Sequence, residues 1–150
     1  MWVLLFTIEF MVPINYIAVL VCAVAAMALG FLWYGQLFSK QWIALMGFTP
    51  EHMAEAQKKG MAKQYGIQFV GALLMAFVLA HSIIFAGAYL NVSGISAGLL
   101  GALWSWLGFV APATIGIVLR DGKPWKLWFI NAGYFLVLLL VMGLIIGLWM

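Results

Sequence analysis

The stretch GISAGLLGALWSWLGFVAPATIGIVLRDGKPWK, residues 94–126, decides the fold class of this 150-residue chain. Residues 95–119 form an apolar run without Asp, Glu, Lys or Arg, and Arg120, Lys123 and Lys126 follow in the next loop. A helix crosses the core of a bilayer with about 20 apolar residues. This stretch therefore predicts a transmembrane helix that ends in a short basic loop.

Three further apolar runs of the same kind flank this stretch. The chain is 67% hydrophobic and only 7% charged, whereas about a quarter of the residues in soluble domains are charged. The runs do not alternate polar and apolar residues, as the strands of a membrane barrel do. We therefore predict an all-α integral membrane protein, with one domain over 1–150 folded as a four-transmembrane-helix bundle. The predicted spans cover about 15–35, 65–90, 95–119 and 127–149.

The basic residues predict the orientation of the bundle. All seven Lys and Arg residues lie either between the first two spans or between the last two. Because cytoplasmic loops are enriched in Lys and Arg, we predict a multi-pass protein of the bacterial cytoplasmic (inner) membrane with both termini outside. The one-sided charge excludes four-helix exporters that insert in both orientations. So few charges also exclude a nucleic-acid partner, which requires a dense basic face.

The first basic loop has the sequence signals of a helix. Thr49 is suited to an N-cap, Pro50 to the first helical position and Glu51 to the first turn. We therefore predict a short polar helix within 48–64, on the cytoplasmic side of the membrane.

The N-terminal segment 1–12 is apolar but contains Glu9 and lacks the basic residues of a signal peptide. We expect it to form an interfacial or extended start of the first helix. The alternative is that Met11 is the natural start and that residues 1–10 do not belong to the native chain.

Small residues predict how the helices pack. Helices in lipid associate where small side chains let their backbones approach, and steps of three and four residues stay on one helix face. The third span has the longest series of this kind, so we predict that the other helices pack against it. Its members are Gly94, Gly98, Gly101, Ser105, Gly108, Pro112 and Gly116. The other spans offer Ala18, Cys22, Ala26 and Gly30, then Ala72, Ala76 and Ala80, then Gly143 and Gly147.

Pro112 removes one hydrogen bond from the third span and leaves the Gly108 carbonyl without its helical donor. A neighbouring helix must then supply a donor, or a cavity must supply water. Counting depth along the fourth span at about 1.5 Å per residue, we expect the Tyr134 hydroxyl to reach Gly108. The same count pairs Asn131 with Thr114.

Aromatic residues cluster where the first span ends and the fourth begins. Trp and Tyr favour the head-group level of a bilayer, so Trp33, Tyr34, Trp42 and Trp125 are predicted interface anchors. The alternative interpretation of the first cluster is an aromatic box that holds a ligand.

His81 is the only histidine within the predicted spans, and histidine is the residue type most often used to transfer protons. We expect a buried, neutral His81 that is hydrogen-bonded across helices. Two alternatives are a His81 accessible to protons and a soft-metal site with Cys22. The sequence has no nucleophile, phosphate-binding or zinc motif. We therefore predict no catalytic residue, no cofactor and no metal.

Two segments carry a resemblance to a known family. NYIAVLVCAVAAMALGFLWYGQLFSKQWIALMG (residues 15–47) and WLGFVAPATIGIVLRDGKPWKLWFINAGYFLVLLLVMG (residues 106–143) resemble an uncharacterised bacterial membrane-protein family, domain of unknown function 1761. The resemblance implies a small four-helix membrane protein without an established activity. It therefore transfers no catalytic or binding residue to this chain.

The function that these observations favour is a non-enzymatic membrane subunit, embedded in the lipid bilayer as a homo-oligomer or beside a partner membrane protein. The alternative is a small channel or facilitator for a neutral or weakly polar solute. That path would follow the glycine face of the third span, with Ser105, Thr114, Asn131, Tyr134 or His81 as its polar residues.

Overall fold

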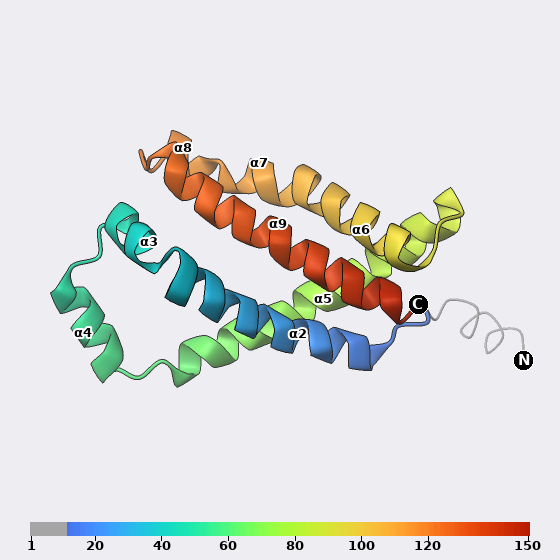
Figure 1. Ribbon diagram of the computed structural model, residues 1–150, viewed down its shortest axis with the longest axis horizontal. Helices are drawn as coiled ribbons and strands as arrows, with labels where there is room; N and C mark the ends of the chain where they lie inside the picture. The colour runs from blue at the N-terminus through green and yellow to red at the C-terminus, as the bar shows by residue number, and fades with distance from the viewer. Residues whose placement is uncertain (1–11) are drawn as a thin grey trace, which may run out of the picture.

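The computed structural model describes residues 12–150, and this part of the chain is helical and contains no strand (Figure 1). Four of its helices are long and apolar enough to cross a membrane, which confirms the predicted four-span, all-α architecture. They cover Tyr16–Leu37, Ala62–Leu90, Gly94–Leu119 and Trp125–Leu148. The predictions for the N-terminal segment fall on residues 1–11 and so lie outside the described residues.

Two of the four spans contain a π-helix. The first span consists of α2 (Tyr16–Gly30) and the π-helix η1 (Phe31–Leu37), and the second is the single helix α5 (Ala62–Leu90). The third consists of α6 (Gly94–Ser105), the π-helix η2 (Trp106–Val110), α7 (Ala111–Thr114) and α8 (Gly116–Leu119). The fourth is α9 (Trp125–Leu148), and α3 (Ser39–Met46) and α4 (Pro50–Lys58) connect the first two spans.

The helix ends follow from local sequence. The Asn15 side chain accepts hydrogen bonds from the backbone N–H groups of Ile17 (3.1 Å) and Ala18 (3.2 Å), and so caps the start of α2. Asn91 ends α5 in the left-handed conformation (φ 54°), which asparagine tolerates better than most residues. These caps separate α2 from the preceding proline and let α5 turn sharply into α6.

The connections place the charged loops at one end of the bundle. In Figure 1, α3, α4 and α8 lie at the left, whereas the C-terminus and the turn between α5 and α6 lie at the right. We call the left end, where α3, α4 and the loop at residues 120–124 gather, the basic end. The right end, with the turn at residues 91–93, is the turn end.

Helix α9 is the centre of the bundle, and the prediction that the third span has this role is wrong. In its most apolar window, 44% of the fourth span is buried, against 6% of the third. Figure 1 shows α9 between α2 and the α6–α8 segment. The fourth span has bulky residues on several sides, among them the buried Leu127, Leu138 and Met142. These side chains fill the space between α9 and the helices around it, so α9 has the largest buried share of the four spans.

At the turn end, α6 and α9 pack backbone against backbone. A Cβ added at Gly98 would overlap the Gly143 carbonyl group and lie 2.8 Å from its carbon atom. One added at Gly147 would lie 2.6 Å from the Gly94 carbonyl oxygen. Gly94 and Gly98 are four residues apart on α6, and Gly143 and Gly147 are four residues apart on α9. The two pairs therefore meet in antiparallel register, where the absence of side chains lets the backbones touch. This contact makes packing positions of the four glycines Gly94, Gly98, Gly143 and Gly147.

The small residues of the first two spans are also packing positions, as predicted. Helices α2 and α5 lie side by side and contribute a buried series of small side chains spaced four residues apart. Four-residue spacing keeps these side chains on one face of an uninterrupted helix. The series consists of Ala18, Cys22 and Ala26 on α2 and Ala72, Ala76 and Ala80 on α5.

The glycine series of the third span does not form one continuous face. Gly101 faces Ile83 of α5, but a Cβ on Gly108 would meet no atom of the described chain within 4 Å. Pro112 is exposed, and Gly116 lies against its own helix's Arg120. The cause is η2, because an extra residue in one turn rotates everything after it by about 100°. The single packing face therefore ends at Trp106.

Helix α4 lies outside the bundle, and all of its residues are exposed. The Thr49 hydroxyl accepts from the His52 backbone N–H (3.4 Å), and Pro50 occupies the first turn. The hydrogen bond from Thr49 and the helix backbone lower the pKa of Glu51 below its ordinary value. Which side of a membrane this helix occupies stays a prediction.

Candidate functional site

Two tryptophans, one in each π-helix, attach the first and third spans to α9. The Trp33 indole in η1 donates to the Ile130 carbonyl oxygen (3.0 Å), and the Trp106 indole in η2 donates to the Ala132 carbonyl oxygen (2.8 Å). A helical carbonyl has a second lone pair, so it accepts such a bond without losing its helical one. The first and third spans are thus fixed to the same turn of α9, two residues apart.

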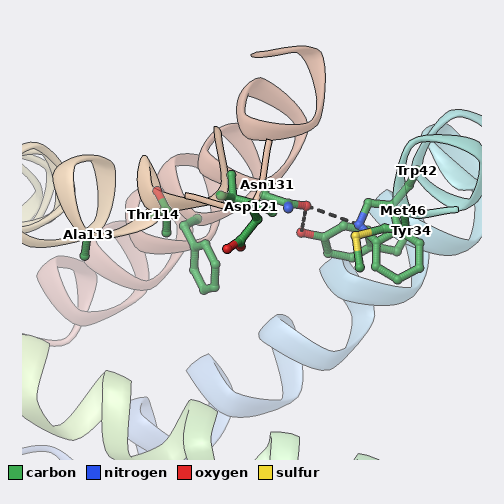
Figure 2. Close-up of a pocket in the computed structure, with 9 residues that line it drawn as sticks. Tyr34, Trp42, Met46, Ala113, Thr114, Asp121 and Asn131 are labelled. Atoms are coloured by element: carbon green, nitrogen blue, oxygen red, sulfur yellow. Dashed lines mark hydrogen bonds between the residues drawn. The ribbon is translucent and has the colours of Figure 1, made fainter. Parts of the chain in front are cut away.

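Asn131 lies between these two carbonyls and joins the first span to α9 (Figure 2). Its Oδ1 accepts from the Tyr34 hydroxyl (3.2 Å) and from the Trp42 indole (3.2 Å). An indole N–H can only donate, so the atom that it meets must be the amide oxygen. This contact fixes the orientation of the amide, and Figure 2 shows the nitrogen on the side of Asp121.

A cavity of about 460 Å³ opens beside this network at the basic end. Tyr34, Trp42 and Met46 form one wall, and Thr114 and Asp121 form another, while Asn131 lies between them. In Figure 2 the Asp121 carboxylate points into the space below α7 and α9. The lining therefore combines aromatic rings, one carboxylate and one amide.

A second, more apolar cavity of about 450 Å³ adjoins the first. Both are lined by Ala113, Thr114 and Phe135, so they meet at this point. From there the second cavity extends between α5 and the third span to Ser82 and Ser105. The two together form a groove from the basic end toward the middle of the bundle.

One charge lies near the opening in addition to Asp121. The Lys123 ammonium group donates to the Met46 backbone carbonyl (3.1 Å), and Met46 lines the first cavity. This bond joins the loop after α8 to the end of α3. An ammonium group therefore lies next to one lining residue of the first cavity, whose own lining includes the Asp121 carboxylate.

Of the predicted polar residues, the structure brings Ser105, Thr114 and Asn131 to this groove, but the predicted pairings are wrong. Thr114 accepts from the Trp128 indole (3.2 Å) and not from Asn131, whose amide oxygen faces the first span. The depth count placed these residues at suitable levels but could not give their rotation about the helix axis. Asn131 therefore joins α9 to the first span and not to the third.

The Tyr134 hydroxyl does not bond to the Gly108 carbonyl, contrary to prediction. Its hydroxyl lies beside Gly30, where an added Cβ would be 3.3 Å away, and its ring packs on Trp33 and Tyr34. Near Pro112, the chain forms η2 instead, in which the Ala111 N–H reaches back to the Trp106 carbonyl. The proline is therefore accommodated by a wider helical turn within its own span.

His81 is also placed differently from its prediction. Its Nδ1 lies 2.9 Å from the Phe77 carbonyl oxygen of its own helix, and its ring packs between Phe77 and Phe85. It is partly exposed on α5 and makes no bond across helices within the described residues. Cys22 is buried elsewhere, with its thiol 3.6 Å from the Met142 carbonyl oxygen.

The predicted interface anchors divide into two groups. Trp125 is exposed, as an anchor in the head-group region would be. Trp33, Tyr34 and Trp42 are half-buried and hold the first span to α9. Tyr34 and Trp42 also line the first cavity, and the alternative interpretation of an aromatic box that holds a ligand stays a prediction.

Sequence reasoning missed four residues of this region: Trp106, Trp128, Asp121 and Lys123. Trp106 and Trp128 lack a distinctive pattern, because each stands in an apolar run where tryptophan is ordinary. Asp121 had a usable signal, since it is the only acidic residue in the second basic loop. An isolated carboxylate among basic residues could have suggested a binding role.

Comparison with known proteins identifies the chain at the level of a family. Residues 17–147 match the family described as a protein of unknown function (DUF1761). Neither a curated protein nor a solved structure matches the chain. Because the match spans all four transmembrane helices, the chain belongs to the DUF1761 family, as its sequence resemblance predicted.

Proposed function

We propose that this protein is a non-enzymatic subunit of a membrane assembly, and that a second copy packs on the middle of its third span. The supporting observation is the low burial of that span combined with its small residues. Gly108 and Pro112 are exposed, although small residues in lipid are typical of helix contacts. The bulky Phe109 between them is 78% exposed, which gives the surface a ridge beside a notch.

A non-enzymatic role is supported by the chemistry of the interior. Within residues 12–150, the buried side chains are apolar or small apart from Tyr134, and no charged side chain is buried. Acid–base or nucleophilic catalysis needs a positioned titratable group. In this proposal, the protein lies in a bacterial inner membrane with its basic end in the cytoplasm.

Cysteine cross-linking in native membrane vesicles tests the assembly. Gly108→Cys in a Cys22→Ala background should give a dimer on treatment with a short bismaleimide. The matched control is Leu74→Cys, an equally apolar but lipid-exposed position on α5 (63% exposed), which should stay monomeric. A monomer at both positions, or equal dimer at both, would overturn the proposal.

A second candidate function is a facilitator for a neutral or weakly polar solute. The cavity lined by Thr114 and Asn131 favours it. The path cannot follow the glycine face, however, because Gly98 is in backbone contact with α9. Glycerol or urea influx into proteoliposomes tests this function, with Asn131→Leu as the inactive variant. Influx equal to that of empty liposomes would exclude it.

A further inference from the structure

The joined cavities at the basic end have the polarity profile of a lipid molecule. The first is lined by Asp121, Asn131 and Trp42, and the second mainly by apolar side chains such as Leu79 and Leu139. Trp125 is exposed at the first residue of α9, at the same end of the bundle as the first cavity, and tryptophan favours the head-group level of a bilayer. The polar part of the groove therefore lies where lipid head groups lie, and the apolar part where acyl chains lie.

The polar part offers groups of both signs. The Asp121 carboxylate accepts hydrogen bonds, whereas Lys123 and the Asn131 amide nitrogen donate them. Because Oδ1 of Asn131 is already used by Tyr34 and Trp42, the group that it presents to the cavity is its N–H₂. A head group that satisfies this set must have an anionic acceptor and a cationic donor.

We propose that this groove binds a zwitterionic phospholipid whose head contains a phosphate and a primary ammonium group. The phosphate lies near Asn131 and Lys123, and the ammonium group hydrogen-bonds to Asp121. One acyl chain passes Ala113 and Phe135 into the cavity between α5 and the third span. A primary ammonium group is specified because charge-assisted N–H···O bonds to a carboxylate are stronger than contacts of a methylated ammonium in water.

Native mass spectrometry tests the selectivity of this site. The full chain is reconstituted in equimolar phosphatidylethanolamine, phosphatidylglycerol and phosphatidylcholine with identical acyl chains, and the retained lipids are then counted. We expect phosphatidylethanolamine to be enriched by roughly threefold or more over each of the others, as one partly exposed charge-assisted bond allows. Equal retention of the three lipids would overturn the proposal.

Two variants locate the site, and one controls for charge. Asp121→Asn should remove the preference for phosphatidylethanolamine, whereas Glu55→Gln, which removes the same charge on the exposed helix α4, should keep it. Ala113→Trp fills the junction of the two cavities and should lower retention of all three lipids. Asp121 and Ala113 are exposed, so thermal unfolding should show all three variants folded. A preference that survives Asp121→Asn, or is lost equally in Glu55→Gln, would contradict the assignment.

A soluble competitor distinguishes a lipid from a free head group. Free phosphoethanolamine at millimolar concentration should not displace the retained phospholipid, because it lacks the chain that fills the second cavity. Displacement would assign the site to a soluble zwitterion and overturn the lipid assignment.

Discussion

The two halves of α9 are held by different means. Near the turn end, Gly143 and Gly147 lie against Gly98 and Gly94, and no side chain separates the backbones. Near the basic end, indole groups reach across to α9 from both neighbours, the Asn131 amide of α9 accepts one more indole bond, and open space remains beside them. Backbone contact leaves no room for a ligand, whereas packing through large polar-tipped side chains leaves cavities. The difference places rigidity in one half and the candidate site in the other.

The largest expected effect comes from the glycine contact. Gly98→Leu should separate α6 from α9 and lower the free energy of unfolding by about 3 kcal/mol or more, because the new side chain overlaps the Gly143 backbone. Thermal unfolding in detergent measures the change. Gly71→Leu is the control, since a Cβ there meets no described atom within 4 Å. If both variants unfold alike, the contrast between the two halves is incorrect.

Removal of the Asn131 side chain should have the next largest effect. Asn131→Ala leaves the Tyr34 hydroxyl and the Trp42 indole without their acceptor, which should cost about 1 to 2 kcal/mol. The same unfolding assay measures it. Ser82→Ala serves for comparison, because among residues 12–150 that hydroxyl bonds only to the Val78 carbonyl of its own helix. An effect no larger than that of Ser82→Ala would mean that the network does not hold the first span.

Trp106→Phe should cost somewhat less, because one indole bond is lost while most of the ring volume stays. We expect about 1 kcal/mol, the usual size of a hydrogen bond between membrane helices. Trp104→Phe is a matched control two residues away, on a side chain that is 65% exposed. Equal stability of the two variants would show that the 2.8 Å bond to Ala132 contributes nothing.

Thr49→Ala should have the smallest effect on the bundle. Loss of the N-cap should destabilise α4 locally by about 1 kcal/mol, seen as faster amide exchange in residues 51–55 with an unchanged unfolding temperature. The Thr49 hydroxyl lowers the pKa of Glu51, so the Glu51 carboxyl group should titrate at a higher pH in the Thr49→Ala variant. Because the pKa of Glu51 is lower in the folded helix, its carboxylate stabilises α4 fully at pH values above the ordinary pKa of glutamate. This stabilisation is lost as the pH falls through the lowered pKa. An unchanged Glu51 titration by NMR would contradict the contact.

The sequence predicted the four spans and much of the packing, and its failures share one cause. Ala18, Cys22 and Ala26 were predicted correctly because α2 is a regular helix and spacing alone sets their face. The positions of Gly108 and Pro112 were not predicted correctly, because η2 changes which residues share a helix face after Trp106. No residue pattern in the sequence predicts a π-helix there. The predicted partners of Tyr134 and Asn131 were wrong because depth along a helix does not give the direction in which a side chain points around the helix axis. The candidate site depends on both quantities, so only part of its residue set could be predicted.

The glycines of the third span also have a consequence for biosynthesis. They give Gly94–Leu119 the lowest mean hydropathy of the four spans, 1.7 against 2.3 to 2.5. Such a segment gains the least by entering the bilayer alone. The fourth span follows after only five residues and has the highest value. We expect the translocon to release the two as a hairpin already paired through its glycines, so that the segment least able to partition alone enters the lipid together with its most apolar neighbour.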